Sequence, residues 1–255
     1  MSEVRMDPVS DNPPILSAVI CTLNHPGYLA NSLASLLAQT AEPGSYEVLV
    51  VDNGPHVATR GVVDGLSSKA VTVRYVVEPV RGLSRARLTG WRQARGGIVA
   101  YLDDDAVADP AWVEATMAAF RAADNRVACV GGPVEITPEG ALEPWYPPSL
   151  AAGFDLGPDV RGLSGDECLW GCSFAFRRDA LEQVAAFTED LGRKDSNLMA
   201  NEDVLVQKRL DASGYARAYD PAIRITHPLP AQRLSKSWVR RRSYWQGVSD
   251  AVMYR

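Results

Sequence analysis

Residues 97–112 read GIVAYLDDDAVADPAW, a short apolar run that ends abruptly in three consecutive aspartates. Such a run, bounded by polar residues, is typical of a buried strand that ends at the edge of a sheet. Asp109 and Pro110 then predict the start of a helix, because aspartate is a favoured N-cap and proline fits the first helical position. Since Asp109 already supplies the cap, the aspartate triplet is left without a structural task.

The same order of strand and helix recurs upstream of this stretch. Apolar runs at 16–23, 47–52 and 71–78 predict strands, and leucines at helical spacing after the first run predict a helix. Residues 82–95 predict a second helix. Alternating strands and helices favour an α/β fold with a mixed, mostly parallel, Rossmann-like sheet flanked by helices.

The second half of the chain is less regular. Prolines and glycines between 137 and 166 predict a long loop, which in a compact domain is usually functional. A strand is expected within 168–178, a short helix at 179–184, and a helix from Asn201 with Glu202 and Asp203 in its first turn. The apolar stretch AIRITH ends in His227, and a basic, aromatic tail follows from Arg233.

Composition excludes several classes of protein. The 255 residues are 46% hydrophobic, which is typical of a globular chain, and the net charge of −5 argues against a nucleic-acid binder. No run approaches the roughly 18 to 20 apolar residues that span a bilayer, so we expect a cytoplasmic protein. The spacing of Cys168 and Cys172, without further partners, does not fit a zinc site, and the four cysteines are expected to be buried thiols.

Polar residues follow three of the predicted strands. These are Thr22 and Asn24 after the first, Asp52 and Asn53 after the second, and Asp103, Asp104 and Asp105 after the run at 97–102. In an open α/β sheet, ligands bind outside the carboxyl ends of the strands, so these side chains are expected to share one rim.

The aspartate triplet predicts a cation or ribose site. Side chains alternate along a strand, so Asp103 and Asp105 should point to one side and Asp104 to the other. Adjacent carboxylates repel unless a cation lies among them, and oxygen ligands suit Mg2+ or Mn2+. Such a cation would neutralise a departing diphosphate, and an acceptor hydroxyl would still need a base. Glu202 and Asp203 are the candidates for that base, although acidic residues also favour a helix N-terminus for electrostatic reasons alone.

The ordered set of motifs resembles family 2 glycosyltransferases of the GT-A fold. The matching segments are SAVICTLN, VLVVDNG, GLSRAR, YLDDDAVADPAW, GGPV, WGCSFAFRR and NEDVLVQKRL, followed by His227. The resemblance implies an inverting, metal-dependent enzyme that uses a nucleoside diphosphate sugar, with UDP or dTDP favoured. It also implies a division of one domain into four parts: a flexible segment 1–14, a nucleotide-sugar-binding half 15–135, a smaller acceptor and base half 136–232, and a basic aromatic helix 233–255.

Residue roles follow from the same resemblance. The base and ribose would be held by Thr22, Asn24, Asp52 and Asn53. The base or phosphates would lie near Arg81 and Arg85, and the ribose would be reached by Asp103 or Asp104. Asp105 would bind Mn2+ or Mg2+, with His227 as a possible further ligand or a structural residue. Asp203 matches the catalytic base, Glu202 a supporting acceptor contact, and Trp170 and Gly171 the acceptor pocket.

Several alternatives stay open at this point. The tail could meet the diphosphate or an anionic acceptor, rest on a membrane surface, or be an ordinary packed helix. The acceptor could be a glycan, lipid carrier, peptide or small natural product. A non-catalytic, degenerate glycosyltransferase and a sugar-1-phosphate nucleotidyltransferase are the rival functions, and the second lacks its expected glycine-rich loop after the first strand.

Overall fold

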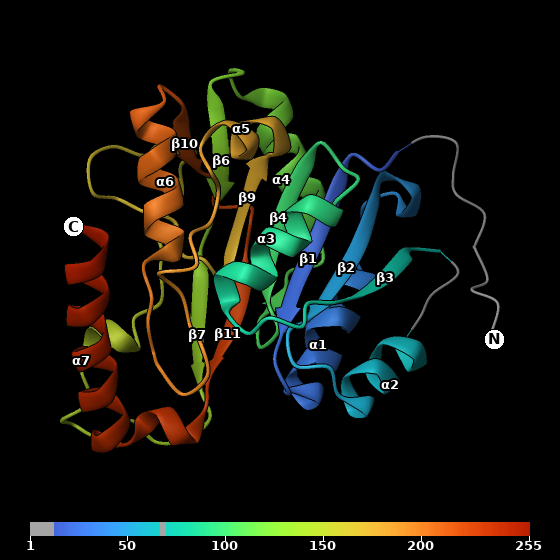
Figure 1. Ribbon diagram of the computed structural model, residues 1–255. Helices are drawn as coiled ribbons and strands as arrows, with labels where there is room; N and C mark the ends of the chain where they lie inside the picture. The colour runs from blue at the N-terminus through green and yellow to red at the C-terminus, as the bar shows by residue number, and fades with distance from the viewer. Residues whose placement is uncertain (1–12, 67–69) are drawn as a thin grey trace.

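The computed structural model describes residues 13–66 and 70–255 and is built around an eight-stranded sheet (Figure 1). The strand order is β3-β2-β1-β4-β9-β6-β10-β8. Four parallel strands form the first half: β1 (Leu16–Thr22), β2 (Tyr46–Asp52), β3 (Thr72–Val77) and β4 (Ile98–Asp103). This confirms the predicted α/β class and the mostly parallel sheet.

One strand in the middle of the sheet runs the other way. β9 (Ser173–Arg177) pairs antiparallel with both β4 and β6 (Val127–Gly131). β10 (Ala216–Tyr219) pairs parallel with β6, and β8 (Arg161–Gly162) covers its other side. Because β9 is reversed, the segment just before it reaches the edge at which β1, β2 and β4 end.

A second, three-stranded sheet completes that edge. Its order is β5-β11-β7, with bounds Val107–Ala108, Ile225–Leu229 and Val134–Pro138. The strand expected to close at His227 therefore continues through Pro228 and Leu229. β5 pairs only with Ile225 and Thr226, so Pro228 lies where the strand has a neighbour on one side, a position that tolerates proline.

Helices cover both faces of the large sheet because alternate residues of each strand point to opposite faces. In β1, Ala18 and Ile20 belong to one buried cluster and Val19 to another. The first cluster packs beneath α1 (Pro26–Leu37), α2 (Val57–Leu66) and α4 (Trp112–Ala122), and the second beneath α3 (Leu83–Gln93), α5 (Arg178–Gln183) and α6 (Glu202–Ala212). The last helix, α7 (Lys236–Met253), stands at the α6 end of the sheet (Figure 1).

Short 3-10 turns and irregular segments join these elements. The turns are η1 (Pro43–Ser45), η2 (Pro148–Leu150) and η3 (Ala231–Leu234). The proline-rich stretch between β7 and β9 is largely irregular, as predicted. Within the described part of the chain, every helix is too short or too polar to cross a lipid bilayer.

Some sequence-based expectations were incomplete or wrong. The helix expected to start at Pro110 begins at Trp112, because the Asp109 carboxylate accepts from the Ala111 N–H and closes a turn before the helix. Strands β6, β7 and β10 were not predicted. Of the segment 1–14, residues 1–12 lie outside the described residues, and the proposed division into halves stays a prediction. All four cysteines are free, but Cys21 and Cys168 are only partly buried.

Candidate active site

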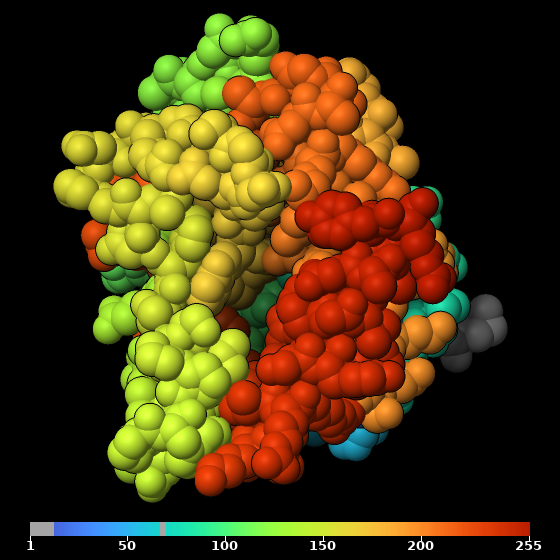
Figure 2. Space-filling view, turned by 90° about the vertical axis from the view of Figure 1, so that its left-hand side faces the viewer, coloured from blue at the N-terminus to red at the C-terminus, as the bar shows by residue number. Residues whose placement is uncertain are grey.

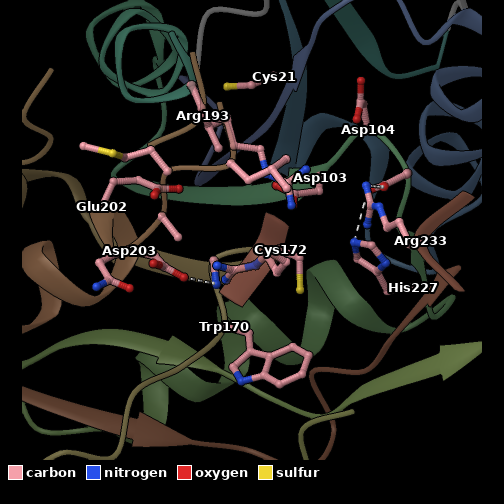
Figure 3. Close-up of a pocket in the computed structure, with 18 of the residues that line it drawn as sticks. Cys21, Asp103, Asp104, Trp170, Cys172, Arg193, Glu202, Asp203, His227 and Arg233 are labelled. Carbon is pink, nitrogen blue, oxygen red and sulfur yellow. Dashed lines mark hydrogen bonds and ion pairs between the residues drawn. The ribbon is translucent and has the colours of Figure 1, made fainter. Parts of the chain in front are cut away.

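A cavity of about 880 Å³ opens at the carboxyl edge of the large sheet (Figure 3). The first half of the chain contributes Thr22 at the end of β1, Asn53 just after β2, and the aspartate triplet, which begins with the last residue of β4. The second half contributes Gly171 before β9 and Asp203 on α6. Figure 2 shows the hollow between α7, in red, and the yellow segment around residues 140–165. Thr22, Asn53 and the aspartate triplet of the predicted rim therefore line one cavity together with residues of the second half.

The aspartate triplet divides as strand alternation predicts. Asp104 accepts a hydrogen bond from the Thr22 hydroxyl at 2.6 Å and lies 3.5 Å from the His25 ring. On the other side, ligand atoms of Asp103, Asp105 and His227 lie within 4.8 Å of one another. Two carboxylates and one imidazole at that separation fit a hard or borderline divalent cation.

Asp105 is the most strongly paired of the three. It lies 3.1 Å from Nε2 of His227 and 3.2 Å from Nη2 of Arg233. Burial raises the pKa of the Asp105 carboxyl, but the hydrogen bond and charge of His227, together with Arg233, more than offset this and hold the pKa below its usual range. The carboxylate is therefore ionised, as a metal ligand must be.

The pKa of Asp103 is raised, whereas that of Asp105 is lowered. Burial raises the pKa of Asp103, the charge of Arg87 lowers it, and the neighbouring Asp105 raises it again. The net increase reflects two carboxylates facing one another in a poorly solvated place. A cation between them would relieve that repulsion, so the donor set fits a divalent metal.

Arg87 joins this cluster to the second acidic pair. Its guanidinium is 3% exposed and bonds Glu202 at 2.7 Å, Asp103 at 3.3 Å and the Gly171 carbonyl at 2.7 Å. The guanidinium also lies over the Phe174 ring, 5.1 Å from its centroid. Arg87 is thus a buried bridge between the two sides of the cavity.

Glu202 and Asp203 begin α6 and differ in their surroundings. Burial raises the pKa of Glu202 to about 7, helped by Asp203 and opposed by Arg87. Asp203 lines the cavity, and its Oδ2 accepts from the Gly171 N–H at 3.0 Å. A Cβ at Gly171 would lie 2.8 Å from that same oxygen, so only glycine allows this close approach.

The start of α6 is anchored by α7. Asn201 has a left-handed backbone (φ 72°), and its side chain bonds Asp250 at 2.7 Å and Gln246 at 2.9 Å. The adjacent Ala200 N–H donates to Ser249 at 2.9 Å. The position of the acidic pair therefore depends on the last helix.

The predicted nucleotide residues are only partly gathered at the cavity. Asn53 lines it, but its side chain also bonds the loop that follows β3, through Glu78, Val80 and Gly82. Asp52 is fully buried and accepts from Gly54 and Tyr75.

Four of these residues lie outside the cavity lining, and their roles stay predictions: Asn24, Asp52, Arg81 and Arg85. Arg81 is exposed, and Arg85 pairs with Glu189 and Glu78.

Trp170 lines the cavity and packs on Phe154, with ring centroids 5.8 Å apart, and its acceptor role stays a prediction. Trp238, Trp245 and Val248, which fall on one face of the tail helix, are half-buried, and Trp238 lines the cavity. Among the tail's large hydrophobic residues, Tyr244 and Tyr254 are the exposed ones.

Sequence reasoning missed several cavity residues. They are His25, Arg87 and Arg193. In the structure Ser84, Arg87 and Gly90 share the buried face of α3, but no local sequence signal distinguishes Arg87 from Arg85 on the same helix.

Comparison with solved structures identifies the fold. The mannosyltransferase PcManGT from Pyrobaculum calidifontis, solved with GDP-Man and Mn2+, aligns with a TM-score of 0.67 at 20% identity, over 92% of this chain and 63% of its own. GalNAc-T7, solved with UDP, GalNAc and Mn2+, aligns with a TM-score of 0.64 at 16% identity, over 86% of this chain and 45% of its own. This chain thus spans less than two thirds of either protein, and the likeness defines a GT-A fold.

Sequence comparison then gives the family. The model of glycosyl transferase family 2 matches residues 17–185. The glucosyl-dolichyl phosphate glucuronosyltransferase of Haloferax volcanii is 30% identical over 246 residues, which cover 93% of this chain and 77% of that protein. The chain belongs to glycosyl transferase family 2, which confirms the resemblance inferred from its motifs.

Proposed function

We propose that the protein is an inverting glycosyltransferase that uses a nucleoside diphosphate sugar and a divalent cation, with Asp203 as the general base. The observation that carries this proposal is that one cavity contains a carboxylate and histidine cluster and, on a separate element, an accessible carboxylate. Both structural relatives were solved with Mn2+ and a nucleotide or nucleotide sugar, which supports the same chemistry here.

Asp103, Asp105 and His227 are the residues that would hold Mn2+ or Mg2+. When bound, the cation would neutralise the charge that develops on the departing diphosphate. Thr22 and Asp104, hydrogen-bonded to each other on the opposite side of the triplet, are the candidates for the ribose. A UDP or dTDP donor remains favoured on the family resemblance.

Asp203 is the better base of the acidic pair because it lines the cavity without an ion-pair partner among the described residues. The acceptor oxygen would attack the anomeric carbon as its proton passes to Asp203, and the bond to the diphosphate would break on the opposite face. Such a single displacement inverts the anomeric centre. Glu202 also lines the cavity but is paired with Arg87, and the supporting acceptor contact stays its proposed role.

Calorimetric titration of UDP, dTDP, GDP and ADP, with and without Mn2+, tests the donor site. We expect metal-dependent binding of one of these, and Asp105→Ala should weaken it at least about tenfold through loss of a ligand. The exposed Asp124→Asn change is the control. Failure of every nucleotide to bind would refute the proposal.

The base is tested separately with Asp203→Asn. This variant should bind the nucleotide like the wild type and lose transfer by about a hundredfold or more, because the amide cannot accept the proton. Undiminished transfer would remove Asp203 from this role. Nucleotide binding without hydrolysis or transfer by the wild type would favour the non-catalytic alternative.

A further inference from the structure

Three arginines line the cavity beside the acidic pair and lack carboxylate partners. Arg193 comes from the loop between α5 and α6, and Arg241 and Arg242 come from α7. Within residues 13–66 and 70–255, none of the three forms an ion pair or donates a side-chain hydrogen bond. Arg87 and Arg233, which line the same cavity, are both paired with aspartates.

Arg242 is the least satisfied of these groups. Its Nη1 is buried and has no hydrogen-bond partner. Burial lowers the pKa of Arg242, and the like charge of Arg193 lowers it further. A buried donor without an acceptor is costly, and two cations that face one cavity repel. An anion bound between the two guanidiniums would remove the repulsion between them.

The position of these arginines favours the acceptor as the source of that anion. Arg242 lies close enough to Glu202 and Asp203 for their charges to act on it, whereas the charge of Arg193 acts on both Glu202 and Asp105, so Arg193 lies between the acidic pair and the aspartate cluster. Arg193 lies on the loop that leads into α6, and Arg242 lies on α7, which anchors the start of α6. The proposed diphosphate site lies instead at the cluster formed by β4 and β11, where Arg233 is already bound to Asp105.

A base and the hydroxyl that it deprotonates must be in contact, so the acceptor has to lie against Asp203. An anionic group attached to that acceptor would then reach the adjacent guanidiniums, which bind phosphate through two parallel hydrogen bonds. Resting on the proposed function, we infer that Arg193 and Arg242 bind a phosphate ester carried by the acceptor.

The experiment uses phenyl phosphate as a probe of this subsite. It is titrated into the full chain already saturated with Mg2+ and the nucleoside diphosphate that binds, so that the donor site is occupied. Arg193→Gln and Arg242→Gln are compared with Arg240→Gln, which removes the same charge from an exposed position on α7 outside the cavity. Nucleotide affinity and thermal unfolding are measured for each variant, which shows whether it is folded.

We expect phenyl phosphate to bind the wild type and Arg240→Gln equally, and each cavity variant about tenfold more weakly. Nucleotide affinity should stay within about twofold in all three. The inference is overturned if phenyl phosphate does not bind the nucleotide-loaded wild type. It is also overturned if the cavity variants lose nucleotide affinity, because that loss would assign the arginines to the donor diphosphate. Failure of the wild type to bind any nucleotide would instead refute the proposed function itself.

Discussion

Replacing Arg87 by methionine tests whether the buried bridge stabilises both halves of the site. The change keeps an apolar stem and removes the cation that neutralises Glu202, 2.7 Å away, and Asp103, 3.3 Å away. Removing one partner of a buried ion pair costs about 3–5 kcal/mol, because the remaining charges stay desolvated. For a chain of this size, about 2–4 °C per kcal/mol gives a decrease in Tm of about 6–20 °C.

The decrease in Tm caused by Arg87→Met should be larger at high pH than at low pH. Since the pKa of Glu202 in the fold is about 7 and above its usual value, its contribution to stability is present at low pH and decreases as pH rises through 7. Arg87 opposes that rise in pKa, so its removal raises the pKa further. The difference in Tm between variant and wild type should therefore be larger at pH 8 than at pH 5.

Thermal unfolding followed by circular dichroism at the two pH values measures both effects. Arg92→Met, at an exposed position on the same helix, is the matched control and should cost less than about 1 kcal/mol. A variant at Arg87 that unfolds within 2 °C of the wild type at pH 8 would refute the reasoning.

Three further outcomes are expected. Gly171→Ala should reduce transfer at least about tenfold with nucleotide affinity unchanged, because the new Cβ would lie 2.8 Å from Oδ2 of Asp203. The control is Gly247→Ala, whose Cβ would meet no atom within 4 Å and which should be neutral in the same transfer assay. Asp250→Ala removes bonds that anchor α6, so kcat should decrease and Tm should drop by a few degrees; an unaltered kcat would contradict the anchoring role. Mn2+ at about a hundred times its Kd should stabilise the metal-free protein by about 2.7 kcal/mol, and His227→Ala should abolish most of that gain in a thermal shift assay.

The first half of the fold could be predicted because its strands are short apolar runs that end in polar residues. Thr22, Asn53 and the aspartate triplet follow such runs, and the parallel order brings them to one edge. The direction of β9 could not be predicted, since its residues carry no local signal for antiparallel pairing. That reversal is what brings Gly171 to the site.

Arg87 shows a second limit of local sequence patterns. An arginine on a helix is usually solvated. Arg87 is buried because it pairs with Asp103 and Glu202, which lie 16 and 115 residues further along the chain. The GLSRAR motif drew attention to the segment, yet the partners that decide which arginine turns inward are set by tertiary structure. The acidic pair, by contrast, was recognisable from its place at a helix start.

The contacts between α7 and the start of α6 also matter for redesigning the protein. The final helix is connected to Ala200 and Asn201 through Ser249, Asp250 and Gln246. Helix α7 and the loop that precedes α6 therefore form one unit, across the cavity from the proposed nucleotide site. On the proposed function, we expect that grafting this pair together from another family member exchanges acceptor preference and leaves the donor half intact. Grafting either piece alone would break the shared hydrogen bonds and misplace Asp203, the proposed base.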